Sequence, residues 1–197
     1  ILIIDKPAGW TSTDVCAKVR GIFREKRVGH GGTLDPMATG VLPVFVGQAT
    51  RGVEFAENGQ KEYVAGLRLG LVTDTQDTTG TFLEIRPVTA DRAAVEAVLS
   101  RFLGEQDQIP PMYSAIKRNG KKLYELARKG QEVERAARPV RIHALELLEA
   151  SGPADYPLRV RCSPGPYRRT LCHDIGPALR RLGRRAALPP PPSPPPY

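Results

Sequence analysis

The chain has 197 residues, and its 29 lysines and arginines outnumber 21 aspartates and glutamates to give a formal net charge of +8. This length fits one domain, or one domain with an insertion, and is enough to bury a hydrophobic core. No stretch approaches the roughly 18 consecutive apolar residues that a membrane-spanning helix needs, so we expect no membrane partner. The positive excess favours an anionic partner, either nucleic acid or a phosphorylated substrate.

The start of the chain and its cysteines indicate a reducing compartment. The sequence opens without an initiator methionine, and without a basic leader and long apolar core, so we expect a fragment of a cytoplasmic protein. Cys16, Cys162 and Cys172 are odd in number and far apart, which does not fit a disulfide framework. The histidines show no metal-ligand spacing. A thiol nucleophile at Cys172 is disfavoured because the adjacent His173 would not face it on a helix.

The first part of the chain predicts two strands and a helix. Residues 1–4 and 41–46 are short apolar runs typical of buried strands. Thr11 and Ser12 can cap a helix. The apolar residues of that helix follow at helical spacing, namely Val15, Val19, Ile22 and Phe23. A glycine-rich loop, 29–40, separates the helix from the second strand.

The middle of the chain predicts a strand, a turn, a helix and an arm. Residues 61–70 alternate as a half-buried strand does, and 73–80 is a polar turn. Thr89 is a good cap for a helix that ends near Gly104. The apolar stripe of this helix contains Val95, Val98, Leu99 and Phe102. Residues 105–139 then combine basic residues with tyrosines, which indicates an inserted basic arm.

The last part returns to regular elements before an unusual end. Residues 140–148 and 158–162 are strand-like, and 170–182 has a helical pattern that Pro177 should interrupt. Residues 189–196 contain seven prolines and one serine, which favours an extended polyproline segment. Strands and helices without a regular βαβ repeat predict an α+β fold with a mixed or largely antiparallel sheet flanked by helices.

The loop at 29–40 carries the most distinctive chemistry. Pro36 disfavours the helical region for Asp35 and holds it extended. The glycines on both sides permit tight turns and let another backbone come close. A plain Asp-Pro turn explains these residues equally well. A phosphate-binding loop is disfavoured because no G-x-G-x-x-G or G-K-S/T pattern is present.

Six segments within residues 1–175 follow one another in an order typical of a single family. They read D-K-P-A-G-W-T-S (5–12), G-H-G-G-T-L-D-P-M-A-T-G-V-L-P (29–43), K-E-Y (61–63), G-L-V-T-D-T-Q-D-T-T-G (70–80), P-P-M-Y-S-A-I-K-R-N-G-K-K-L-Y-E (110–125) and C-S-P-G-P-Y-R-R-T-L (162–171). Together they resemble the motifs of the TruB family of tRNA pseudouridine synthases. The last segment resembles that family's C-S-x-G-T-Y-I-R-S/T-L.

This resemblance implies a domain plan and a reaction. Residues 1–183 would form a pseudouridine synthase catalytic domain, with a thumb inserted at about 105–133 that closes over an RNA hairpin. Residues 184–197 would be a disordered proline-rich tail, and the RNA-gripping PUA domain of the family would be absent. The reaction would convert uridine-55 in the T-arm of tRNA to pseudouridine, with no cofactor and no metal. The thumb favours the stand-alone bacterial type, which needs no guide RNA, and we expect a monomer.

The resemblance also implies roles for individual residues. Asp35 would be the nucleophile, attacking C1′ of the ribose or C6 of the uracil or acting through a glycal, and Arg169 would pair with it. Tyr63 would be a catalytic residue that stacks on the target base and moves a proton late in the reaction. The remaining substrate contacts would be His30, which enters the RNA stack, Tyr167, on the flipped nucleotide, and Asp77, near the base. The thumb would bind RNA through Lys117, Lys121, Lys122 and Arg128.

Departures from the family pattern leave alternatives open. Pro166 stands where threonine is usual, and the resemblance ends after about Leu182, as a truncated or frame-shifted gene end would explain. A first alternative is therefore an RNA-binding chaperone that folds the T-arm with little or no turnover. A second is a glycoside hydrolase using Asp35, Asp74 and Asp77, which lacks clear support for a paired acid and nucleophile.

Overall fold

The structure is a computed structural model that divides into two compact units, Ile1–Gln60 and Lys61–Tyr197. We describe each unit by itself. The described residues are 1–77, 80–85, 87–88, 90–114, 116–118, 120–149, 152 and 154–186, with side chains described up to 179. Thr89, predicted as a helix cap, and the proline-rich residues 189–196 lie outside the described residues.

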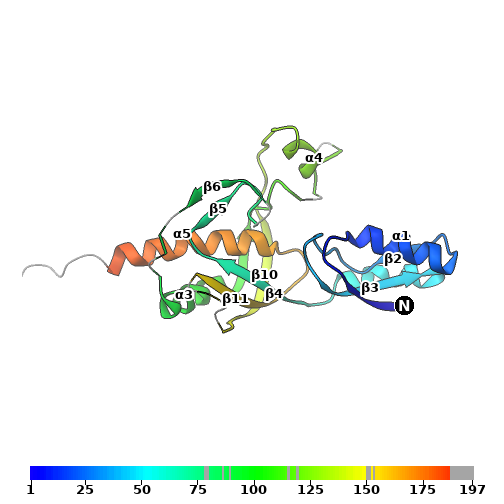
Figure 1. Cartoon of the computed structure of the whole chain (residues 1–197), viewed down its shortest axis with the longest axis horizontal. Coiled ribbons are helices and arrows are strands. Elements are labelled where there is room, and N and C mark those ends of the chain that lie inside the picture. The colour runs from blue at the N-terminus through cyan, green and yellow to red at the C-terminus, as the bar shows by residue number, and fades with distance from the viewer. Residues whose placement is uncertain are drawn as a thin grey trace, which may run out of the picture. The chain divides into compact units, whose positions relative to one another are not determined.

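The first unit is a three-stranded antiparallel sheet with a helix packed on one face (Figure 1). Its strand order is β1-β3-β2. Its elements are β1 (Leu2–Lys6), α1 (Ser12–Phe23), β2 (Val28–His30), β3 (Gly40–Val46), a 3₁₀ helix (Gly47–Gly52) and α2 (Val53–Glu57). The predicted cap is confirmed: the Thr11 side chain accepts from the Asp14 N–H, and Asp14 accepts from the Thr11 N–H.

The face of this sheet opposite α1 is only partly buried, which corrects the prediction of fully buried strands. Phe45 on that face is buried and lies beside Gly52 of the 3₁₀ helix. Leu42 and Val44 pack against α1, whereas Ile3 and Val41 on the opposite face are 66% and 69% exposed. Successive strand residues point to opposite faces, so a helix on one side covers every second residue. The last turn of α1 also lies outside the core cluster, which leaves Ile22 and Phe23 exposed instead of buried.

The second unit is built on a four-stranded antiparallel sheet of order β4-β11-β10-β7. Two helices, α3 and α5, pack on it (Figure 1), and their apolar residues join the inward-facing strand residues in one core. The bounds are β4 (Lys61–Arg68), β7 (Gly104–Gln108), β10 (Arg138–Leu147), β11 (Asp155–Cys162), α3 (Arg92–Leu99) and α5 (Arg168–Ala186). Every strand pairing between described residues is antiparallel, which confirms the predicted α+β class.

A small hairpin, an arm and a 3₁₀ turn complete the second unit. The hairpin pairs β5 (Leu71–Thr73) with β6 (Phe82–Ile85), and the 3₁₀ turn is Ser100–Phe102. The arm carries β8 (Lys117–Arg118), β9 (Lys121–Lys122) and α4 (Leu123–Ala127), and α4 lies apart from the large sheet (Figure 1). Residues 105–108, predicted to open the arm, instead belong to β7 and pair with β10.

The helices of the second unit differ from the predictions at two points. The cap of α3 is Asp91, whose carboxylate accepts the Ala94 N–H at 2.8 Å. The predicted interruption at Pro177 is wrong, because α5 continues through it. A proline crowds the Cβ of the preceding residue, and here that residue is Gly176, which has none. The buried residues Leu171, Ile175 and Leu179 anchor the helix before and after the proline.

Candidate active site

The loop that carries Asp35 is anchored in the first unit by a buried lysine. Lys6 is fully buried, and its Nζ donates to the carbonyls of Pro7 at 2.9 Å, Trp10 at 2.6 Å and Pro36 at 3.2 Å. The Pro36 carbonyl also accepts the N–H of Gly9 at 2.8 Å, in a turn whose φ of +83° suits glycine. A buried ammonium needs a hydrogen-bond acceptor for each of its donors. Because one of these acceptors is the Pro36 carbonyl, Lys6 holds the residue after Asp35 in place.

A second anchor holds the residue before Asp35. The Oγ of Ser12, itself buried, accepts the Leu34 N–H at 3.0 Å. The Asp35 carbonyl accepts the Ala38 N–H at 3.0 Å, which closes a turn after Asp35. The backbone is therefore fixed on both sides of a half-buried carboxylate. This arrangement suits a group that must meet a substrate in one orientation.

His30 ends β2, opposite Val44. Within the described part of the chain, its buried Nδ1 has no hydrogen-bond partner. Buried polar side-chain atoms normally find a partner, so this nitrogen is an exception among the described residues.

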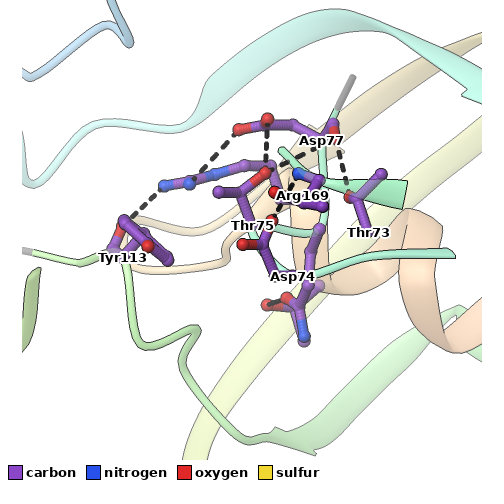
Figure 2. A network of polar contacts seen from close by, with 9 residues as sticks. Thr73, Asp74, Thr75, Asp77, Tyr113 and Arg169 are labelled. Carbon is purple, nitrogen blue, oxygen red and sulfur yellow. Dashed lines mark hydrogen bonds and ion pairs between the residues drawn. The ribbon is translucent and has the colours of Figure 1, made fainter. Parts of the chain in front are cut away.

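In the second unit, Arg169 lies at the start of α5 and contacts two other segments (Figure 2). Its Nη1 is 3.5 Å from Oδ2 of Asp77, and its Nη2 donates to the Tyr113 carbonyl at 2.9 Å. The Arg169 and Asp77 side chains are only 17% and 15% exposed. One guanidinium thus connects the 73–80 turn with the base of the arm.

Hydroxyl groups orient Asp77 from the other side (Figure 2). Thr75 Oγ1 donates to Asp77 Oδ1 at 2.8 Å, and Thr73 Oγ1 donates to the Asp77 carbonyl at 2.7 Å. The Thr170 hydroxyl donates to Oε1 of Gln76 at 3.0 Å, which ties the same turn to α5. These hydrogen bonds fix the carboxylate and the guanidinium relative to one another.

The two predicted aromatic residues lie near the same end of α5. Tyr167, just before the helix, exchanges two hydrogen bonds with the buried side chain of Gln108: its N–H donates at 2.7 Å and its carbonyl accepts at 3.1 Å. Tyr63 lies on β4 opposite Val160 and packs against the core. The Arg168 guanidinium carbon is 4.1 Å from the centre of the Tyr63 ring.

The four predicted basic residues lie together on the arm. Lys117 is on β8, Lys121 and Lys122 are on β9, and Arg128 follows α4. Lys122 and Arg128 approach the Tyr124 ring, at 5.4 Å and 5.3 Å from its centre. Such contacts hold cationic groups over an aromatic face while leaving their charge available.

The structure thus groups Tyr63, Asp77, Tyr167 and Arg169 in one unit, and Asp35 and His30 in the other. Arg169 and Asp35 belong to different units, so their predicted pairing stays a prediction. Sequence reasoning did not assign roles to Thr73 or Thr75, although both lie inside the quoted segments. Gln108 lies outside those segments, so nothing in the motifs could have found it.

Rival chemistries gain no support from the described residues. Burial raises the pKa of the Cys172 thiol to about 11, so little thiolate exists at neutral pH. Asp74 accepts the Thr81 N–H at 2.8 Å, which gives it a structural contact in the hairpin. Within the described ranges, no three His, Cys, Asp or Glu residues are grouped as a metal site requires. No described helix is long and apolar enough to cross a bilayer.

Comparison with known proteins identifies relatives over most of the chain. The family model described as "TruB family pseudouridylate synthase (N terminal domain)" matches residues 20–168. The chain is 51% identical to tRNA pseudouridine synthase B of Azoarcus sp. (strain BH72), over 91% of this chain and 59% of that protein. It is 49% identical to the Burkholderia mallei (strain NCTC 10247) protein of the same name, with the same coverage. The chain therefore spans less than two thirds of the length of these relatives.

Solved structures show the same fold. The match to a chain in the crystal structure of a Cbf5-Nop10-Gar1 complex has a TM-score of 0.69 and 34% identity, covering 90% of this chain and 44% of the other. A chain in the structure of an H/ACA RNP bound to a substrate RNA containing 2′-deoxyuridine matches with a TM-score of 0.64 and 30% identity, covering 90% and 42%. On the strength of the family model and these relatives, the chain belongs to the TruB family of pseudouridylate synthases.

Proposed function

We propose that this chain converts uridine-55 in the T-arm of tRNA to pseudouridine by flipping the base out of the RNA and attacking the nucleoside with Asp35. The observation that carries the proposal is the Asp35 loop, fixed by Lys6 and Ser12 on both sides of the carboxylate, in a chain of the TruB family. A carboxylate is ionised at neutral pH and can form and release a covalent bond.

The proposed reaction is an isomerisation in which every heavy atom is retained. The bond between N1 of uracil and C1′ of the ribose breaks, the base turns, and a bond forms between C5 and C1′. The C5 proton leaves and N1 gains a proton. Asp35 attacks C1′ or C6, or assists through a glycal, and Arg169 provides the cation that keeps this carboxylate ionised as water leaves.

The contacts of Arg169 link the proposed base-binding residues to the arm that we propose binds RNA. Arg169 connects Asp77 with the carbonyl of Tyr113, and Tyr113 lies at the base of the basic arm. We propose that the arm binds RNA phosphates through Lys117, Lys121, Lys122 and Arg128. Tyr63 stacks on the flipped base, Tyr167 and Asp77 contact the flipped nucleotide, and His30 enters the stack that the base has left. Stacking on protein aromatics partly offsets the cost of extruding a base.

The test measures tritium release from a T-arm hairpin labelled at C5 of its uridines, because C5 loses its hydrogen only if the carbon glycoside forms. Wild type should release tritium, and Asp35→Asn and Asp35→Ala should release none above background. Asp107→Asn is the matched control, since Asp107 is an exposed aspartate on β7, and it should match wild type.

Two results would contradict the proposal. Equal tritium release by wild type and Asp35→Asn would show that Asp35 is not the nucleophile. Tight hairpin binding by wild type without tritium release would support the alternative, a T-arm folding chaperone.

A further inference from the structure

Two arginines follow one another at the start of α5, Arg168 and Arg169, directly after Tyr167. The two neighbouring arginines have different contacts. Arg169 binds Asp77 and the Tyr113 carbonyl, whereas the Arg168 guanidinium lies over the ring of Tyr63.

The contact between Arg168 and Tyr63 is close and partly shielded from water. The guanidinium carbon is 4.1 Å from the ring centre, well inside the about 6 Å range of a cation–π interaction. Both side chains are half-buried, and Tyr63 packs on the core of the second unit. The Arg168 charge also acts to lower the pKa values of Cys162 and Cys172, against the rise that burial causes. A half-buried cation is partly shielded from water, which strengthens its attraction to an aromatic face.

The helix dipole disfavours a positive charge at the position of Arg168. It is the first residue of α5, where the helix dipole is positive, and the first turn of α5 contains no acidic residue. The Tyr63 ring face provides an electron-rich surface for this charge. The pair therefore couples the start of α5 to the middle of β4.

We propose that Arg168 is a positioning residue for Tyr63. Its guanidinium covers one face of the ring and fixes the orientation of the phenol. A pyrimidine that contacts this ring must then use the opposite face or the ring edge. This inference rests on the proposed function, in which Tyr63 stacks on the target base.

A fixed ring should matter more for turnover than for RNA affinity. Affinity for a hairpin comes mainly from phosphate contacts, whereas the reaction needs the base in one orientation. Arg168→Ile leaves an apolar side chain at this position and removes the cation. We expect it to lower the single-turnover rate on the T-arm hairpin about tenfold, the size of a half-buried cation–π contact. Hairpin Kd should change by less than about threefold, because the arm is intact.

The conservative variant separates positioning from a general structural effect. Arg168→Lys keeps a cation that can lie over the ring and should recover the rate to within about threefold of wild type. Arg161→Ile is the matched control, since Arg161 is an exposed arginine on β11, and its rate should equal that of wild type. Thermal unfolding of each variant confirms that it is folded.

A spectroscopic readout keeps the proposal testable without turnover. The chain has six tyrosines, and 3-fluorotyrosine labelling followed by Tyr63→Phe assigns the fluorine signal of Tyr63. On addition of the hairpin, this signal should shift in wild type and in Arg168→Lys. In Arg168→Ile it should differ already in the free chain and broaden on binding, because the ring is no longer held.

The outcomes distinguish this inference from the proposed function. Wild type that never releases tritium defeats the proposed function, and the fluorine titration still tests the pair. The inference is overturned if Arg168→Ile leaves both rate and fluorine signal unchanged. It is equally overturned if Arg168→Lys is as impaired as Arg168→Ile. A rise in the hairpin Kd of Arg168→Ile by the same factor as its rate falls would also overturn it, because Arg168 would then act as a phosphate contact.

Discussion

Replacing Lys6 by methionine tests whether the Asp35 loop depends on a buried ammonium. Lys6 is fully buried and donates to three carbonyls, those of Pro7, Trp10 and Pro36. Methionine fills a similar volume but donates nothing. In Lys6→Met the Pro36 carbonyl still accepts the Gly9 N–H. The carbonyls of Pro7 and Trp10 lose the ammonium as their donor.

The expected loss follows from these contacts. A buried carbonyl left without a donor costs about 1–3 kcal/mol. Pro7 and Trp10 are exposed residues, so water can replace part of what their carbonyls lose, and the desolvation cost of the buried charge disappears. We therefore expect a destabilisation of about 1–2 kcal/mol for Lys6→Met. Lys18 is an exposed lysine on α1, and Lys18→Met should stay within about 0.5 kcal/mol of wild type.

The assay is urea unfolding followed by tryptophan fluorescence. The chain has a single tryptophan, and it is Trp10, whose own carbonyl binds Lys6, so the signal reports on this loop. The midpoint should fall for Lys6→Met, with Lys6→Gln between it and wild type because an amide supplies two donors. Equal midpoints for the Lys6→Met and Lys18→Met chains would refute the reasoning, since the buried ammonium would then contribute nothing to the loop.

Two further predictions concern the arm and the thiols. Replacing Lys121 and Lys122 by alanine should weaken hairpin binding and flatten the slope of log Kd against log salt by about 1–2, whereas the same change at the exposed Lys18 and Lys26 should leave the slope unchanged. An unaltered slope in the arm variant would exclude phosphate contacts there. Burial raises the pKa of Cys172 from 9.0 to about 11, so at pH 8 its thiolate fraction is about a hundredfold lower in the folded chain. Iodoacetamide should therefore modify Cys172 about a hundredfold more slowly in buffer than in urea, and similar rates in both would show that the thiol is accessible and ionised.

Local patterns predicted the elements because their causes are local. Thr11 caps α1 since its hydroxyl reaches an N–H three residues away. The alternation in β4 predicted a half-buried strand, and Leu67 and Tyr63 indeed face the core. Pro36 and the glycines indicated a loop that displays Asp35. Burial was predicted less well, since Ile3 and Val41 are apolar yet lie on the face of the sheet that is only partly covered.

The sequence by itself predicted the α+β class, the longer helices and strands and the family motifs, since helix and strand patterns depend on neighbours within a few residues. It did not predict β2, α2 or β7. Only the tertiary structure decided the partners of the functional side chains. Arg169 meets Tyr113 and Asp77 across 56 and 92 residues of chain, and Lys6 reaches Pro36 across 30. Such contacts depend on how distant segments pack, and the continuation of α5 through Pro177 depends in the same way on the core that holds both halves.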